Sequence, residues 1–220
     1  MFEQPSSPEH IPSSAKPHIL AQVISDFFSP LLIPTYGMAM AMWLTSLRAL
    51  PERSRFLATL LIAMITGLLP LLAIATMRRT GAVSDNSISD RRQRPLPMAI
   101  VMACYIGAGY FLACAHAPLW LQMFFYGASL AVLIALGITL YWKISAHTTA
   151  MGGLVGMLLW FAVGGIADVN AMVLLSLGII CAGAVATSRI ALGRHTLWQV
   201  IAGFFLGICC TFIPTWIFCH

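Results

Sequence analysis

Charged side chains are scarce in this sequence. Asp, Glu, Lys and Arg make up 9% of its 220 residues, whereas 60% are hydrophobic. A soluble domain carries roughly 25% charged residues. A chain this apolar has too few polar side chains to cover a globule that faces water, so lipid must be its solvent. The composition excludes a soluble domain and predicts an integral membrane protein.

Other patterns are also lacking. The formal charge of +5 comes from basic residues spread over short connections, so nucleic acid is not a predicted partner. No cysteines have the C-x-x-C spacing, and we expect neither a metal site nor a disulfide framework. Residues 1–19 are rich in Pro and Ser without a long apolar core, which argues against a cleaved signal peptide there. We interpret residues 1–19 as a polar tail and residues 20–220 as a single transmembrane domain.

What the sequence has in abundance is long apolar segments. A spanning helix needs about 20 mostly apolar residues. The first candidate follows Asp26 and contains Pro30 and Pro34, so we expect it to be kinked or broken at its start. The sequence predicts an all-α, polytopic transmembrane helical bundle of six to seven spans, near Phe27–Leu47, Phe56–Met77, Met98–Ala115, Leu119–Trp142, Thr148–Ile166, Ala171–Ala186 and Leu197–Phe218.

Seven alternating spans place the polar connections on two sides. One side receives nine of the twelve Lys and Arg residues and four of the six histidines. Three segments supply most of this polarity: 89–95 (Ser-Asp-Arg-Arg-Gln-Arg-Pro), 143–147 (Lys-Ile-Ser-Ala-His) and 188–195 (Ser-Arg-Ile-Ala-Leu-Gly-Arg-His). We therefore expect the chemistry of the protein on this face.

The residue types in these segments suit an anion. A turn at Gly193 would bring Arg189 beside His195, where the guanidinium binds a phosphate bidentately and the imidazole attacks phosphorus or moves a proton. The small residues before His147 let backbone N–H groups approach a ligand at a helix N-terminus. Taken singly, each cluster is also explained by side chains that reach lipid headgroups or by the positive-inside rule. Their convergence on one face favours the phosphate site.

The three segments resemble the ordered motifs of the type-2 phosphatidic acid phosphatase family, the membrane-bound histidine phosphatases, commonly K-x6-R-P, P-S-G-H and S-R-x5-H-x3-D. This chain has Arg94-Pro95, then Ser145-Ala146-His147, then Ser188-Arg189-x5-His195. The third match is the specific one, and the other two are degenerate. The resemblance covers about half of the chain, from Ser89 to Gln199.

The resemblance implies a role for each matching residue. His195 would be the nucleophile that forms a phosphohistidine, and His147 would protonate the leaving group before water releases inorganic phosphate, with no metal or other cofactor. The phosphate oxygens would be held by Arg94, Arg189, Ser145 and the backbone at Ala146.

The chain departs from the family pattern at several positions. The family Lys falls at Ser87, a charge that Arg91 or Arg92 could supply, and the Pro and Gly of the second motif are Ile144 and Ala146. The Asp expected four residues after the nucleophile is Gln199, which can orient the ring of His195 but cannot offset its charge. Asp26 and Asp90 share the polar face, and we hypothesise that one of them replaces this carboxylate.

The sequence thus predicts an enzyme, a phosphatase for a lipid phosphate or polyprenyl diphosphate. Its predicted partners are that substrate and membrane lipids, and the substrate and the oligomeric state stay open. The alternative is a weakened relative that binds phosphate headgroups without turnover. A prenyltransferase would need paired Asp-rich motifs, and a transporter would need polar residues near the midplane of several spans. The Lys and Arg count places the motif face in the cytoplasm, whereas the resemblance places it on the outer face of a cytoplasmic membrane, which we favour.

Overall fold

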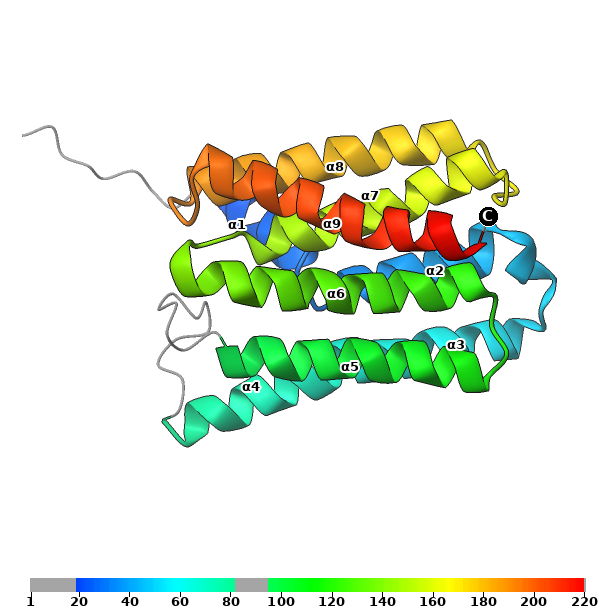
Figure 1. Ribbon diagram of the computed structural model, residues 1–220, viewed down its shortest axis with the longest axis horizontal. Helices are drawn as coiled ribbons and strands as arrows, with labels where there is room; N and C mark the ends of the chain where they lie inside the picture. The colour runs from blue at the N-terminus through cyan, green and yellow to red at the C-terminus, as the bar shows by residue number, and fades with distance from the viewer. Residues whose placement is uncertain (1–18, 82–94, 220) are drawn as a thin grey trace, which may run out of the picture.

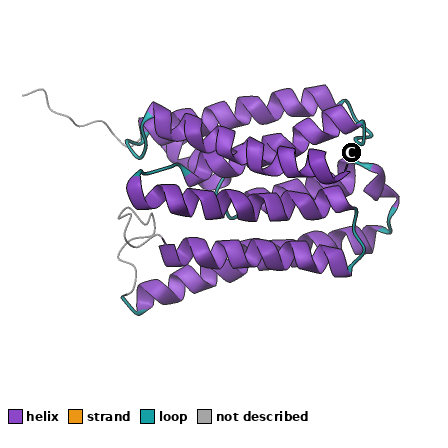
Figure 2. Cartoon of the chain, viewed as in Figure 1, coloured by secondary structure: helices purple, strands orange, loops and turns teal. Residues whose placement is uncertain are grey.

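The computed structural model describes residues 19–81 and 95–219. These residues form an all-α bundle, and no strand occurs among them (Figures 1 and 2). Its elements are α1 (Ile19–Phe27), α2 (Ile33–Leu44), the 3-10 turn η1 (Ser46–Ala49), α3 (Glu52–Ala63), the π-helical turn η2 (Met64–Leu68), α4 (Leu69–Arg79), α5 (Pro95–Cys114), α6 (Leu119–Tyr141), α7 (Ala146–Gly164), α8 (Ala171–Ala191) and α9 (Leu197–Cys219).

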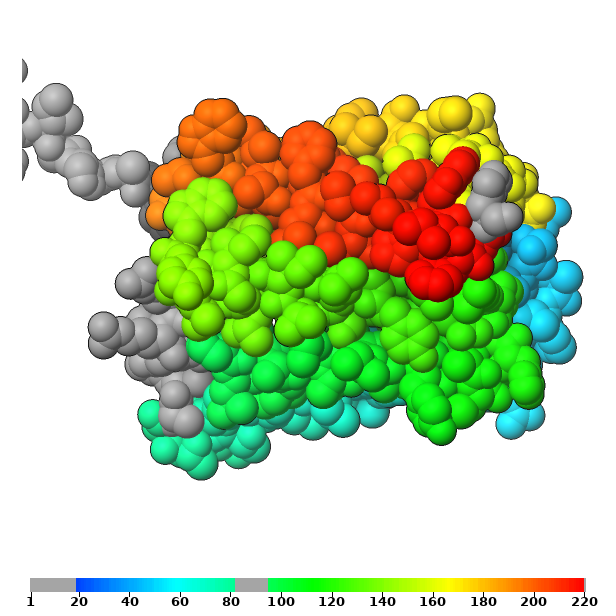
Figure 3. Space-filling view, viewed as in Figure 1, coloured from blue at the N-terminus to red at the C-terminus, as the bar shows by residue number. Residues whose placement is uncertain are grey.

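Six helical segments of the described chain are long and apolar enough to cross a membrane. One is the continuous run of α3, η2 and α4, Glu52–Arg79, and the others are α5 to α9. Large apolar side chains such as Leu72, Ile180 and Ile217 are exposed on the outer surfaces of these helices, where lipid would cover them. Figure 3 shows one such outer surface, formed by α5, α6 and α9. The chain is an integral membrane protein, and the six later predicted spans are confirmed.

The first predicted span, Phe27–Leu47, contains one short helix, α2, which is not among the six segments of the described chain that are long enough to cross a membrane. Helix α1 ends where this predicted span begins, and residues 28–32, which include Pro30, separate α1 from α2. Ser25 of α1 contacts Arg189 at the last turn of α8, whereas Thr45, just after α2, forms a β-bridge with Ala167, before the start of α8. The α1–α2 pair therefore runs the length of α8, and the predicted broken start is confirmed.

Glycine residues bring α7 and α9 into backbone contact at the centre of the bundle. A Cβ on Gly152 of α7 would collide with the carbonyl oxygen of Phe204, and one on Gly207 of α9 would collide with that of Thr149. In lipid, close backbone approach at small residues is a main source of helix association. The Thr211 hydroxyl adds a 3.1 Å hydrogen bond to the Gly153 carbonyl. This contact fixes how the first turns of α7 and α9 lie relative to each other.

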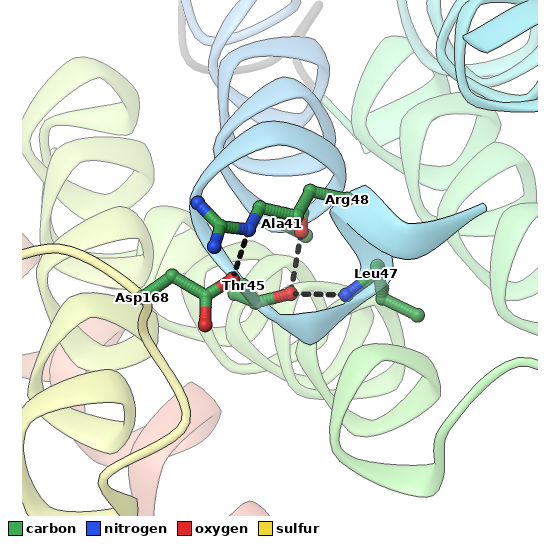
Figure 4. Close-up of polar contacts among 5 residues, drawn as sticks. All are labelled: Ala41, Thr45, Leu47, Arg48 and Asp168. Carbon is green, nitrogen blue, oxygen red and sulfur yellow. Dashed lines mark hydrogen bonds and ion pairs between the residues drawn. The ribbon is translucent and has the colours of Figure 1, made fainter. Parts of the chain in front are cut away.

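The two ends of the bundle carry different connections. The α6–α7 and α8–α9 connections lie at the same end, on the left in Figure 1, and the Ser145 N–H of the first lies 3.4 Å from the Gln199 carbonyl at the start of α9. At the other end, Arg48 after α2 pairs with Asp168 before α8, Nε to Oδ2 at 2.9 Å (Figure 4). The predicted grouping of connections is confirmed for the described residues.

Candidate functional site

Gln199 holds the ring of His195. The side-chain oxygen Oε1 of Gln199 accepts the Thr196 backbone N–H at 3.2 Å and lies 3.0 Å from Nδ1 of His195. A backbone N–H can only donate, so the amide atom that faces both groups is the oxygen, an acceptor. Nδ1 of His195 must therefore carry the hydrogen, and in the neutral ring Nε2 keeps the lone pair. The expectation that Gln199 orients the ring agrees with this geometry.

Gln199 also has a structural role. It is the third residue of α9, and its side chain reaches back to the backbone N–H that precedes the helix, as in a capping box. Its backbone carbonyl receives the Ser145 N–H from the α6–α7 connection. One residue thus connects the α6–α7 connection to the start of α9.

His147 is the second residue of α7, which begins at Ala146. The N-cap of α7 is Ser145, whose hydroxyl accepts the Thr148 N–H at 3.4 Å. Ser145 is fully buried and does not line the cavity described below, so its side chain caps the helix, whereas Ala146 and His147 do line that cavity. The structure places the predicted phosphate-binding Ser145 beneath the site.

Arg189 lies in the last turn of α8, because this helix continues to Ala191 and not to Ala186 as predicted. The predicted turn occurs at Gly193, whose φ of 63° is a left-handed conformation that glycine adopts readily. The turn reverses the chain, and the Arg194 N–H donates to the Arg189 carbonyl at 3.1 Å. Buried His195 and half-buried Arg189 are both close enough to His147 to interact with it electrostatically.

Helix α1 supplies residues that the motif comparison missed. The Arg189 Nη1 donates to the Ser25 hydroxyl at 2.7 Å, and the Ser25 backbone lies close enough to the His147 ring to interact with it electrostatically. Asp26 accepts a hydrogen bond of 2.8 Å from Gln22. A sequence signal for this face existed, because polar residues recur at helical spacing in an apolar segment: Gln22, Ser25, Asp26 and Ser29.

A cavity of about 640 Å³ begins at these residues and continues into the bundle. Its polar end is lined by Asp26, His147, Arg189 and Arg194, and its apolar wall comes from α2, α5 and α6. Along α6 the lining runs from Ala135 to Phe124, about 16 Å at 1.5 Å of rise per residue. This is roughly half of a hydrocarbon core of about 30 Å. The cavity therefore joins a polar end to a deep apolar interior.

The structure thus brings together His195, Gln199, His147, Ala146 and Arg189 at one end of the bundle. Arg91, Arg94 and Asp90 lie outside the described residues, so their predicted part in the site stays a prediction. Asp26 lines the same cavity as His147 and Arg189, but Nδ1 of His195 faces Gln199. The amide of Gln199 thus faces the ring nitrogen at which the motif resemblance would place an Asp.

Comparison with known proteins gave no assignment. No family model, no curated protein and no solved structure matches this chain.

Proposed function

We propose that this protein hydrolyses a membrane lipid phosphate, or a polyprenyl diphosphate, through a phosphohistidine at His195. The observation that carries the proposal is the hydrogen-bond arrangement at His195, in which the Gln199 oxygen holds the proton on Nδ1, so that the lone pair of the neutral ring lies on Nε2. His195 does not itself line the cavity, but a second histidine and an arginine, His147 and Arg189, do line its polar end. These two residues lie close to one another, and His195 interacts electrostatically with His147.

In the first step, Nε2 of His195 attacks phosphorus and the bond to the leaving oxygen breaks. His147, in its protonated form, transfers its proton to that oxygen, so an alcohol or a phosphate departs. Arg189, which lines the same cavity as His147, stabilises the negative charge of the phosphoryl oxygens. Nδ1 keeps its hydrogen on Gln199 throughout.

In the second step, water attacks the phosphohistidine and the P–N bond breaks. His147, now neutral, takes the proton from water, and inorganic phosphate leaves. His195 regains the lone pair on Nε2. Because Gln199 is neutral, the positive charge that the ring acquires on phosphorylation is not offset there, and the first step would be slower than with a carboxylate.

The cavity supports a substrate with an apolar tail. Its polar end places an anionic headgroup by Arg189 and Arg194, and its apolar walls would shield a hydrocarbon chain. A water-soluble phosphate ester would gain nothing from these walls. We therefore expect catalytic efficiency to rise with the length of the tail.

A second candidate function is binding of phosphate headgroups without turnover. The observation that favours it is Gln199, since the structural capping of α9 would retain this residue in a protein without catalysis.

The test is release of inorganic phosphate by the detergent-solubilised protein. The substrates are phosphatidic acid, phosphatidylglycerol phosphate, a polyprenyl diphosphate and lipid A phosphates, with glycerol phosphate as the tail-less control. Release from at least one lipid, lost in His195→Ala, supports the phosphatase. Binding of these lipids without release supports the second candidate, and neither binding nor release would contradict both.

We place the protein in the cytoplasmic membrane with the site on its outer face, following the motif resemblance. Arg53 and the site lie on opposite sides, whereas Asn86 lies in the connection before α5. Cysteines introduced at these two positions, labelled in intact cells with an impermeant maleimide, test this orientation. We expect labelling at position 86 alone. Labelling at position 53 alone would show that the site lies on the cytoplasmic face.

A further inference from the structure

Ser25 contacts two residues of the proposed site from a helix outside the motif region. Its hydroxyl oxygen accepts a 2.7 Å hydrogen bond from Nη1 of Arg189, 164 positions later in the chain. Its backbone lies close enough to the ring of His147 to interact with it electrostatically. Ser25 is only 1% exposed, and α1 packs against α8. A single buried residue therefore joins α7 and α8 at the polar end of the cavity.

These two contacts act on different groups. A hydrogen bond from a guanidinium is charge-assisted and directional, so the hydroxyl fixes where the remaining N–H groups of Arg189 point. The Ser25 backbone lies close enough to the ring of His147 to interact with it electrostatically. Side-chain substitution at position 25 removes the hydrogen bond to Arg189 and retains the backbone beside His147. The two effects can therefore be separated by experiment.

We propose that Ser25 is a positioning residue that aims Arg189 at the phosphate, so that α1 completes the site. This inference rests on the proposed function. It assigns a role to α1, which lies outside the part of the chain that contains the three motifs. The Asp26 and Gln22 side chains lie on the same helix and line the same cavity, so α1 forms one wall of the site.

The experiment compares Ser25→Ala with Ser129→Ala. Ser129 is also buried and also bonds across a helix interface, to the Met102 carbonyl at 3.4 Å, but it does not line the cavity. Inhibition by inorganic phosphate reports on Arg189, and the ratio of kcat to KM reports on the transition state. We expect Ser25→Ala to weaken phosphate inhibition and lower kcat/KM, each about tenfold, the size of one lost hydrogen bond to a charged group. Ser129→Ala is expected to change neither by more than about twofold.

A double-mutant cycle makes the test specific. In an Arg189→Lys background the bidentate fork is absent, so Ser25→Ala is expected to have little further effect on phosphate inhibition. Additive losses would mean that Ser25 acts elsewhere and would overturn the proposal. Ser25→Cys serves as a second variant if Ser25→Ala does not fold. Cysteine is close to serine in size but is a weak acceptor, so we expect the same weakening of phosphate inhibition and the same fall in kcat/KM.

Failure of the role of Ser25 and failure of the proposed function give different results. If the wild-type protein releases phosphate from lipids and Ser25→Ala keeps wild-type kcat/KM and phosphate inhibition, the role of Ser25 is refuted and the phosphatase stands. If the wild-type protein neither releases nor binds phosphate, the proposed function itself fails.

Discussion

The arginines at the two ends of the bundle have different surroundings. At the end formed by η1 and the α7–α8 connection, Arg48 meets the carboxylate of Asp168, and Arg55 lies 5.2 Å above the ring of Trp43. At the motif end, Arg189 meets a neutral hydroxyl and lines a cavity together with Arg194 and His147.

The two arginines differ in what they face. Arg48 meets a carboxylate and does not line the large cavity, so this pair connects the end of α2 with the segment before α8. Arg189 is instead held by a hydroxyl from α1 and lines the cavity, where under the proposed function its charge acts on an anionic headgroup. The following predictions test this difference.

Loss of the nucleophile should have the largest effect. His195→Ala is expected to lower the rate of phosphate release by about 10⁴-fold or more, since it removes the group that forms the covalent intermediate. The measurement is phosphate release at saturating lipid substrate. The control is His116→Asn at the opposite end, because asparagine tolerates the positive φ of 53° found there. Equal activity in the two variants would remove His195 from the chemistry.

Loss of the arginine at the motif end comes next. Arg189→Ala is expected to lower kcat by about 10²–10³-fold, the usual loss when one donor to a developing oxyanion is removed. Steady-state kinetics in detergent would measure it. Arg189→Lys restores the charge without the fork, so it should recover only part of the activity. Full activity in Arg189→Ala would mean that the arginine serves structure alone.

A carboxylate at position 199 should increase activity. Gln199→Glu keeps the length of the side chain and the acceptor for Nδ1 and for the Thr196 N–H, and it adds a charge beside His195. Charge-assisted hydrogen bonds are about twice as strong as neutral ones, so we expect kcat to rise about tenfold. Gln199→Leu, which lacks the acceptor, is the matched control and should lose activity. An unchanged rate in Gln199→Glu would show that ring charge does not limit the reaction.

The smallest effect is expected at the opposite end. Arg48→Ala breaks the ion pair with Asp168, whose partners are partly exposed, and such pairs contribute about 0–1 kcal/mol. We expect kcat/KM to stay within about twofold of wild type and the unfolding temperature in detergent to fall only slightly. A large loss of activity would contradict the division of roles between the two ends.

Much of the fold could be predicted because lipid allows few solutions. Backbone N–H and C=O groups in a bilayer must form their hydrogen bonds within helices. Length and hydropathy alone therefore located six spans. Alternation of the spans then gathered the segments around His147 and His195 at one end. The boundaries were less accurate: α8 continued past Ala186 to Ala191 and drew Arg189 into its last turn.

The contribution of α1 could not be predicted in the same way. The contact of Ser25 with Arg189 joins residues 164 positions apart, and no local pattern specifies it. The predicted last span already began at Leu197, the first residue of α9, so the position of Gln199 in the first turn was predictable, whereas its hydrogen bonds to Thr196 and His195 were not. The close approach of α7 and α9 had a visible signal, small residues four apart on each helix: Gly152 and Gly156, and Gly203 and Gly207.

The central claim is that His195 becomes covalently phosphorylated, and rapid-quench labelling tests it directly. The protein is mixed with a lipid carrying radiolabelled phosphate, quenched in alkali, in which phosphohistidine is stable, and digested. The account predicts acid-labile label on the peptide that contains His195 and no label in His195→Ala. Release of phosphate without label at His195, or binding of the lipid with neither label nor release, would contradict it.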